Sequence, residues 1–475
     1  MVDLVITHGT LLTLDENDTI IEDGVILIEK GRIISVERGV NGLSPLYPQA
    51  KVIDASGMVV MPGLVNTHTH LGATIIRGIS DDVDGMDWMP LNWSVMAHIT
   101  KEDLYLAALI GIAEMIASGT TCFNDSYQDI EQTARAVAET GLRADLAAGL
   151  TERNGKKDAQ RLLDVARDFV AEWHGKADGR IRARLGPHAL YTCSTEYVLK
   201  ARQIANDLGV GMHMHLAESP LEMRMVKNKA GETSVQHLHA LGVLQRDFFI
   251  AHALTINEED MRIIAEAGCG IAHCPQSLGK LGAYPFPAVD AWMRAGINVG
   301  IGTDGVASNN NLDLFEELRF AALTRKLFAR DGRTLPARQV IRMGTIMGAR
   351  ALGLGDEIGS LEIGKKADII LVDVRKPHLA PFHNIYGLLA YSALGSDVDS
   401  VIVDGKVLME HRHFTTLDVE DILERAQGAF TNLLKRAGWK YSLAEPTQNI
   451  ATMMKLKATQ QSLKIFQAMV GGKKE

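Results

Sequence analysis

Alternating apolar and polar side chains mark both ends of the chain as β-rich. Short runs of this kind occur at residues 4–9, 11–14, 24–36, 359–373 and 398–409. Such alternation is typical of strands that bury one face. Two turns, Glu29-Lys30-Gly31-Arg32 and Asp404-Gly405, are typical of hairpins. The simplest arrangement pairs the two ends, so we expect one composite β-domain built from both.

Between these ends, apolar runs that finish in polar residues alternate with helical patterns. The apolar runs cover residues 59–70, 120–126, 143–150, 181–190, 211–219, 248–254, 270–275 and 298–305. The clearest helical patterns cover residues 104–118, 130–140, 197–208, 258–267 and 288–295. Eight strand-and-helix units in strict alternation predict a (β/α)₈ barrel. An open doubly wound sheet is the alternative, but no Gly-x-Gly-x-x-Gly follows an early strand.

The expected fold class is therefore α/β, a (β/α)₈ barrel with a small composite β-sandwich domain. Residues 1–60 and 356–415 are expected to form the sandwich, and residues 61–355 the barrel. Residues 416–475 are expected to form a helical C-terminal extension. Its last part mixes apolar and lysine side chains over residues 450–470, so a packed terminal helix is preferred there to a partner contact.

Composition narrows the class of protein. The chain has 475 residues, 46% of them hydrophobic, and a net charge of −9 without a basic stripe, which argues against nucleic-acid binding. Four cysteines without CxxC spacing indicate reduced thiols in a cytosolic protein. The N-terminus lacks the basic and apolar regions of a signal peptide, and no apolar run is long enough to span a membrane. We expect a cytoplasmic protein.

Histidines gather where the predicted strands end. Of 16 histidines, seven lie at such ends: His68, His70, His188, His213, His215, His252 and His273. Residues two apart on a strand share a face, so His68 and His70 point the same way. The carboxyl ends of barrel strands converge on one mouth, where the active site lies. Three imidazoles and a carboxylate at this mouth suit Zn²⁺ or Fe²⁺ with an open position for water.

Four motifs carry a resemblance that covers nearly the whole chain. They are Pro62-Gly-Leu-Val-Asn-Thr-His-Thr-His70, His215-Leu-Ala-Glu218, His252, and Gly302-Thr-Asp-Gly-Val-Ala-Ser-Asn-Asn310. With them the chain resembles the amidohydrolase superfamily, in the branch of the S-adenosylhomocysteine and 5′-methylthioadenosine deaminases and the s-triazine hydrolases. The resemblance implies that the metal ligands are His68, His70, His215 and Asp304. It also implies that Glu218 and His252 handle protons and that His188 lies beside the substrate.

These roles predict a hydrolase that uses a single metal ion. A bound metal lowers the pKa of water toward about 7, so hydroxide is available at neutral pH. Glu218 is placed to shuttle a proton to the leaving nitrogen, and Asp304 to act as ligand and base in turn. Relatives with two metals use a carboxylated lysine on the fourth strand, but residues 181–190 contain no lysine. We expect one divalent ion, Zn²⁺ first, with Fe²⁺ or Co²⁺ as alternatives.

Several residues have a second interpretation. His213 is an alternative ligand to His215, although the spacing to Glu218 favours His215. His273 either caps a strand or touches substrate, and Cys274 beside it is interpreted as inert packing. Asp81 and Asp82 are interpreted as a solvated turn. Trp88 and Trp93, in the first long loop, either stack on a flat substrate ring or exclude water.

The substrate is expected to be a small molecule whose C–N or C–Cl bond is cleaved by a metal-bound hydroxide at an amidine-, urea- or heteroaryl-type carbon. Against the nucleoside deaminases, residues Met96-Ala97-His98 lack the acid that holds ribose, and Leu278 replaces a polar residue. These departures favour a triazine- or phenylurea-like substrate. The candidate substrate contacts are His188, Trp88, Trp93, Leu278 and Asn309.

Two alternatives stay open. The first is a deaminase of S-adenosylhomocysteine, 5′-methylthioadenosine or a related aminopurine. The second belongs to another class, a scaffold homologue without catalysis, which the complete set of ligand positions disfavours. By analogy with the group, we also expect a homo-oligomer.

Overall fold

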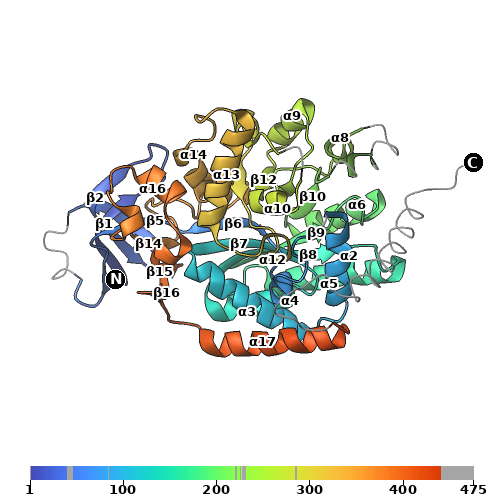
Figure 1. Ribbon diagram of the computed structural model, residues 1–475, viewed down its shortest axis with the longest axis horizontal. Helices are drawn as coiled ribbons and strands as arrows, with labels where there is room; N and C mark the ends of the chain where they lie inside the picture. The colour runs from blue at the N-terminus through green and yellow to red at the C-terminus, as the bar shows by residue number, and fades with distance from the viewer. Residues whose placement is uncertain are drawn as a thin grey trace, which may run out of the picture.

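Eight parallel strands close into a barrel at the centre of the chain (Figure 1). The computed structural model describes residues 2–39, 47–83, 85–219, 222–224, 226, 232–283 and 286–439. The barrel strands are β6 (Leu64–Thr69), β7 (Thr120–Tyr127), β8 (Arg143–Leu150), β9 (Ile181–Pro187), β10 (Met212–Leu216), β11 (Phe248–His252), β12 (Gly270–His273) and β13 (Val299–Ile301). They pair in chain order, and β13 pairs with β6 to close the barrel. The predicted barrel is confirmed.

The first apolar run, expected as one strand, is divided between two sheets. Its first part forms β5 (Met58–Pro62), which pairs outside the barrel, and its second part forms β6. Gly63 makes the transition and donates its backbone N–H to the Asp368 carbonyl at 2.9 Å. A Cβ at Gly63 would lie 2.1 Å from the Thr121 side chain. Only glycine fits at this close approach of the two strands.

Both ends of the chain contribute to a second, mixed sheet of nine strands. Its members are β1 (Leu4–Leu12), β2 (Ile20–Glu29), β3 (Arg32–Arg38), β4 (Lys51–Asp54), β5, β14 (Ile369–Asp373), β15 (Val398–Val403), β16 (Lys406–Glu410) and β17 (His413–Phe414). The strand β5 joins the two ends, because it pairs with β1 on one side and β14 on the other. Hydrogen bonds thus link the strands of the expected sandwich into one sheet.

Helices surround the barrel and follow its strands. They are α3 (Lys101–Ala117), α4 (Glu131–Thr140), α5 (Lys156–Trp173), α6 (Thr195–Leu208), α8 (Ser234–Ala240), α9 (Glu258–Ala267), α11 (Val289–Arg294) and α13 (Leu314–Ala329). Local sequence sets several of their ends. Thr100 and Asp103 form a capping box that starts α3, and Gly141 ends α4 in the left-handed conformation.

Shorter elements complete the chain. Four follow barrel strands on the side of their carboxyl ends: η1 (Leu71–Ile76), α2 (Gly85–Met96), α10 (Pro275–Lys280) and α12 (Val306–Asn309). The others are α14 (Ala337–Met343), α15 (Ile346–Ala351), η2 (Pro377–Leu379), α16 (Ile385–Tyr391) and η3 (Gly395–Asp397). Trp88 and Trp93, expected in a loop, lie on α2. The expected loop is therefore largely a helix.

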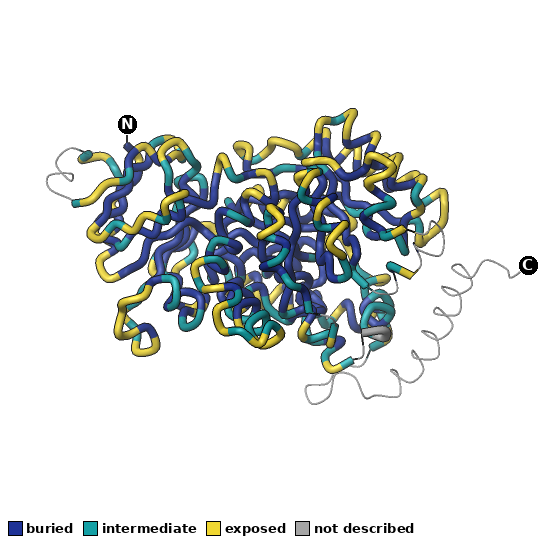
Figure 2. The backbone as a smooth tube through the Cα atoms, turned by 90° about the horizontal axis from the view of Figure 1, so that it is seen from above, coloured by how far each residue is buried: buried dark blue, intermediate teal, exposed yellow. Residues whose placement is uncertain are grey.

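The barrel and the sheet share a buried boundary. Arg143, the first residue of β8, donates from Nε to an Asp368 carboxylate oxygen at 2.7 Å, and both side chains are buried. Asp368 immediately precedes β14, so this ion pair ties the barrel to the sheet. The buried segments run through both parts of the molecule, with exposed segments around them (Figure 2).

The last described helix, α17 (Val419–Arg436), packs along α3 (Figure 1). Arg436 at its end forms an ion pair with Asp103 and donates to the His98 carbonyl. The expected extension is thus helical over α17, while residues 440–475 lie outside the described residues. In the part of the chain that the structure describes, no helix is both long and apolar enough to cross a membrane.

Candidate active site

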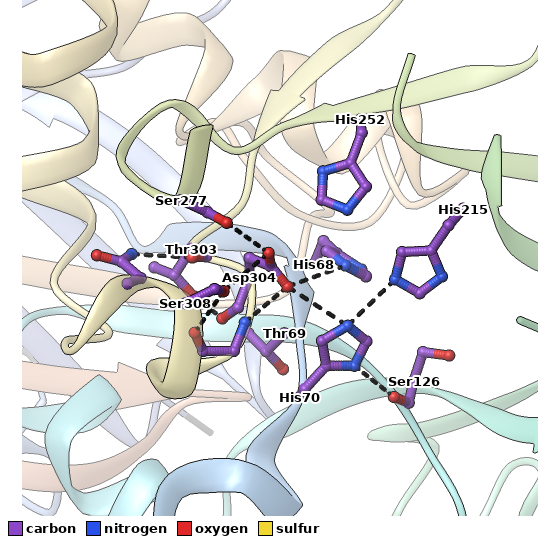
Figure 3. A network of polar contacts seen from close by, with 12 residues as sticks. His68, Thr69, His70, Ser126, His215, His252, Ser277, Thr303, Asp304 and Ser308 are labelled. Carbon is purple, nitrogen blue, oxygen red and sulfur yellow. Dashed lines mark hydrogen bonds and ion pairs between the residues drawn. The ribbon is translucent and has the colours of Figure 1, made fainter. Parts of the chain in front are cut away.

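Four strand ends bring histidines and an aspartate together at the barrel mouth (Figure 3). His68 lies within β6, His70 directly follows it, His215 lies near the end of β10, and His252 is the last residue of β11. Asp304 lies beyond the end of β13. Both His252 and Asp304 have positive φ angles, 75° and 60°, which turn their side chains out of the regular strand direction.

The donor atoms of these side chains lie at distances typical of a shared ion. His70 Nε2 lies 3.1 Å from His215 Nε2 and 3.4 Å from Asp304 Oδ1, which lies 3.6 Å from His68 Nε2. Donors bonded to one tetrahedral zinc at its usual bond lengths are about 3.4 Å apart. The four side chains that the sequence predicts as ligands are therefore brought together.

The ring nitrogens are arranged to leave lone pairs facing one another. His70 Nδ1 lies 2.6 Å from the Ser126 carbonyl, and His215 Nδ1 lies 2.9 Å from the His188 carbonyl. A carbonyl can only accept, so each Nδ1 carries the hydrogen and each Nε2 presents a lone pair. Two lone pairs 3.1 Å apart repel unless a cation lies between them. The donor set therefore fits a divalent metal ion.

Burial favours the unprotonated form of two histidines in the cluster, His68 and His215. His68 is fully buried, and neither of its ring nitrogens has a hydrogen-bond partner among the described residues. Burial and the neighbouring histidines hold the pKa of His68 well below its ordinary value. Burial likewise lowers the pKa of His215. Unprotonated imidazoles are the form that binds metal.

Asp304 is held from behind by two hydroxyl groups. Ser277 and Ser308 donate to its Oδ2 at 2.6 and 2.9 Å, while Oδ1 accepts from the Gly305 N–H and faces His68 and His70 (Figure 3). Burial alone would raise the pKa of Asp304, but His252, His70 and the Ser277 hydrogen bond outweigh it. The pKa therefore lies below its ordinary value, and Asp304 is a carboxylate.

His252 stands at the edge of this cluster. Its donor atom forms a triplet with those of His68 and His215, all within 4.8 Å, alongside the triplet of His68, His70 and Asp304. His252 Nε2 also lies 3.9 Å from Glu218 Oε1, and its Nδ1 has no partner among the described residues. The geometry thus places His252 between the cluster and Glu218.

Glu218 is fixed by two residues that the sequence did not single out. The Tyr191 hydroxyl donates to Glu218 Oε2 at 2.8 Å. The buried Glu222 carboxylate accepts the backbone N–H groups of Ala217 and Glu218 at 2.9 and 3.0 Å. These contacts leave Glu218 Oε1 facing His252 and the cluster. Glu222 follows Glu218 by four residues, whereas Tyr191 comes from the segment after β9, which only the folded barrel brings beside Glu218.

Of the predicted substrate contacts, His188 lies beside the cluster. Its ring centroid is 4.8 Å from that of His215, and its Nδ1 lies 2.9 Å from Thr192 Oγ1. Trp88 donates from Nε1 to the Ala307 carbonyl at 2.8 Å, which connects α2 to α12. The Arg153 guanidinium lies 3.2 Å from the ring centre of Trp93.

Leu278 and Asn309 are both buried, on α10 and α12 respectively. Leu278 lies on α10, one residue after Ser277. The Asn309 amide nitrogen donates to the Thr303 carbonyl at 2.8 Å and to Glu317 at 2.6 Å. Asn309 is thus engaged with the segment that carries Asp304.

The structure also shows the surroundings of His213, His273 and Cys274, for which the sequence left two interpretations. His213 stacks on His68 at 5.0 Å, but neither donor triplet of the described residues includes it. His273 packs against Phe286 and Trp292, and burial lowers its pKa to about 3. Cys274 is buried, which raises its pKa and agrees with an inert thiol.

The turn expected at Asp81 and Asp82 is present and Asp82 is exposed, but Asp81 is partly buried and paired. Its carboxylate forms an ion pair with Lys280 at 2.6 Å and accepts from the Asn310 amide at 3.0 Å. The loop before α2 is therefore tied to α10 and to the segment after α12. Sequence spacing gives no sign of this contact, because the partners are about two hundred residues apart.

Comparison with known proteins identifies relatives along nearly the whole chain. A family model described as the amidohydrolase family matches residues 59–408. A 5′-deoxyadenosine deaminase from Methanosarcina mazei is 42% identical over 92% of this chain and 99% of the relative. A 5-methylthioadenosine/S-adenosylhomocysteine deaminase from Thermoanaerobacter pseudethanolicus is 39% identical over 91% of this chain and 100% of the relative.

Solved structures give the same picture of the fold. A zinc-bound adenosine deaminase from Xanthomonas campestris superposes with a TM-score of 0.86 and 30% identity, covering 91% of this chain and 99% of that chain. An atrazine chlorohydrolase variant from Arthrobacter aurescens, complexed with zinc and atraton, superposes with a TM-score of 0.83 and 25% identity. The match covers 90% of this chain and 100% of that chain. The higher identities belong to deaminases, so they support the deaminase alternative better than the triazine-like substrate.

Proposed function

Because the chain belongs to the amidohydrolase family and acts on carbon–nitrogen bonds, we propose that it deaminates a 5′-substituted adenosine. The substrate class proposed is 5′-deoxyadenosine, 5′-methylthioadenosine or S-adenosylhomocysteine. The observation that carries this proposal is 42% identity to a 5′-deoxyadenosine deaminase over 92% of the chain. The cluster of His68, His70, His215 and Asp304 supplies a site for the chemistry.

The proposed metal ligands are the Nε2 atoms of His68, His70 and His215 and Oδ1 of Asp304. The fit rests on the lone pairs that face one another and on the unpartnered nitrogens of His68. We propose Zn²⁺, which the adenosine deaminase and the chlorohydrolase relatives hold. When bound, such an ion acts as a Lewis acid that lowers the pKa of water, so that hydroxide is available for the attack at neutral pH.

The proton-handling residue in this proposal is Glu218. Deamination consumes one water and releases one ammonia: the water oxygen bonds to the ring carbon and the exocyclic C–N bond breaks. Glu218 Oε1 faces the cluster while Tyr191 holds Oε2. Glu218 therefore takes a proton from the attacking water and delivers it to the exocyclic nitrogen of the substrate, so that this nitrogen leaves as ammonia.

His252 and His188 are proposed to complete the site. His252 lies between Glu218 and the cluster, where its ring can hydrogen-bond the oxygen that is added to the substrate. His188 lies against His215 and is placed to contact the purine. The two tryptophans of α2 are proposed to cover the bound ring and exclude water.

A panel of substrates tests this function. Zinc-loaded protein is incubated with 5′-deoxyadenosine, 5′-methylthioadenosine, S-adenosylhomocysteine, a chlorotriazine and a phenylurea. The proposal expects ammonia release from the adenosines and little chloride or aniline release from the other two. Turnover of the triazine or phenylurea, with the adenosines left intact, would contradict the proposal and restore the first substrate hypothesis.

A further inference from the structure

The carboxylate of Asp304 is oriented by side chains from two short helices. Ser277 lies on α10 and Ser308 on α12, and both hydroxyls donate to Oδ2 of Asp304. Because Oδ2 is engaged twice, Oδ1 is the oxygen that faces His68 and His70. The position of Oδ1 therefore depends on where α10 and α12 lie relative to β13.

One residue of a third helix connects these two helices. Glu317 on α13 accepts the Gln276 backbone N–H with Oε2 at 3.2 Å and the Asn309 amide with Oε1 at 2.6 Å. Gln276 directly precedes Ser277, and Asn309 directly follows Ser308. The same Asn309 nitrogen donates to the carbonyl of Thr303, the residue before Asp304. A single carboxyl group therefore contacts both helices directly, and it reaches the segment before Asp304 through Asn309.

The carboxyl group of Glu317 makes these hydrogen bonds in a fully buried position. Glu317 is completely buried, and no lysine, arginine or histidine of the described residues forms an ion pair with it. Desolvation raises its pKa well above the ordinary value. A buried carboxyl without a cation is destabilising unless its oxygens are hydrogen-bonded. Here both oxygens accept from N–H groups, whereas a glutamine would turn its own N–H₂ toward one of those donors.

We infer that Glu317 is a positioning residue that aligns the Asp304 carboxylate for metal binding by fixing α10 and α12 around it. The inference rests on the proposed function, because it takes Asp304 as a metal ligand. Glu317 acts through Ser277, Ser308 and Asn309 and does not touch the ion. Partners of this kind orient metal ligands, and their loss typically lowers metal affinity or activity by about 10- to 100-fold.

The test compares Glu317→Gln with Glu316→Gln. Glu316 is the adjacent residue of α13 and is exposed, and among the described residues its carboxylate accepts a surface hydrogen bond from Asn311. Metal-free protein is titrated with Co²⁺, whose visible absorption reports the geometry of its ligands, and kcat and KM are measured with 5′-methylthioadenosine. We expect Glu317→Gln to bind Co²⁺ about 10- to 100-fold more weakly, with an altered spectrum and a lower kcat at similar KM. Glu316→Gln should match the wild type.

Wild-type Co²⁺ affinity and spectrum in folded Glu317→Gln would overturn the inference, even if turnover fell. Should that variant not fold, the double variant Ser277→Ala/Ser308→Ala decides, since it removes both hydroxyls from Asp304 and leaves Glu317 in place. Weaker Co²⁺ binding in the double variant supports the inference, and unchanged binding overturns it. A wild type that binds Co²⁺ but deaminates nothing refutes the proposed function alone, because the Co²⁺ comparison needs no substrate.

Discussion

Single residues in this protein are fixed by backbone groups far away in the sequence. The Ser126 carbonyl sets the tautomer of His70, and the His188 carbonyl sets that of His215. The sequence indicates the ligand residues themselves, because each lies where an apolar run ends. It does not indicate Tyr191 or Glu317, since their roles depend on which segments meet after folding.

The proton-shuttle role of Glu218 has a residue-scale consequence. Replacing Glu218 by glutamine keeps the shape of the side chain but removes its ability to take a proton. We expect turnover to fall by about a hundredfold or more, because general acid–base groups contribute about 10²- to 10⁴-fold. Bound metal, measured by elemental analysis, should stay at the wild-type level.

The matched control is Glu266→Gln, an exposed glutamate whose contact is an ion pair with Arg262. It should retain full activity. Full activity in Glu218→Gln itself would remove Glu218 from the proposed mechanism.

Asp313 gives a pH-dependent prediction. It starts α13 by accepting the Phe315 and Gly395 N–H groups at 2.8 and 3.0 Å, and burial raises its pKa to about 6. The folded state therefore keeps a proton that the unfolded state loses between pH of about 4 and 6. This contribution to stability, of order 3 kcal/mol, is present below pH of about 4 and is lost as the pH rises through about 6.

Asp313→Asn cannot titrate, so the difference in unfolding free energy between the wild type and this variant should change with pH. We expect the difference to move against the wild type between pH 4 and pH 7, measured by urea unfolding of metal-free protein. A difference that stays constant over this range would show that Asp313 carries no raised pKa.

At the scale of elements, strand position was predictable and sheet membership was not. The apolar run at 59–70 is continuous in sequence, yet Gly63 transfers it from the mixed sheet to the barrel. Hydrophobic patterning reports burial, and both halves are buried, so the pattern does not show the change of sheet. The helix α2 was missed because Pro90, a residue that disfavours a helix interior, lies inside it and its apolar side chains follow no single face.

The close approach at Gly63 predicts a cost for any side chain there. Gly63→Ala would place a Cβ against Thr121, and overpacking of this kind costs about 1–3 kcal/mol. Urea unfolding should detect this loss. Gly332→Ala is the control, because no described residue has an atom within 4 Å of the point where its Cβ would lie, and it should change stability by less than about 0.5 kcal/mol. Equal stability of the two variants would contradict the tight contact.

At the scale of the whole molecule, the sequence indicates that the chain ends come together, and the mixed sheet of nine strands confirms it. The way the sheet meets the barrel, through Arg143 and Asp368, follows from three-dimensional packing and has no local signal. The comparisons likewise support the deaminase alternative better than the triazine- or phenylurea-like substrate. The substrate hypothesis weighted the local departures at Met96 and Leu278, whereas relatedness over 92% of the chain favours the adenosine deaminases.

The central claim is that one divalent ion is bound by three histidines and an aspartate that lie at the carboxyl ends of the barrel strands β6, β10 and β13. Anomalous diffraction from crystals grown with zinc tests it most directly. We expect a single peak about 2.0–2.2 Å from Nε2 of His68, His70 and His215 and from a carboxylate oxygen of Asp304. A peak that excludes Asp304, two peaks in the mouth, or no peak at all would contradict the claim.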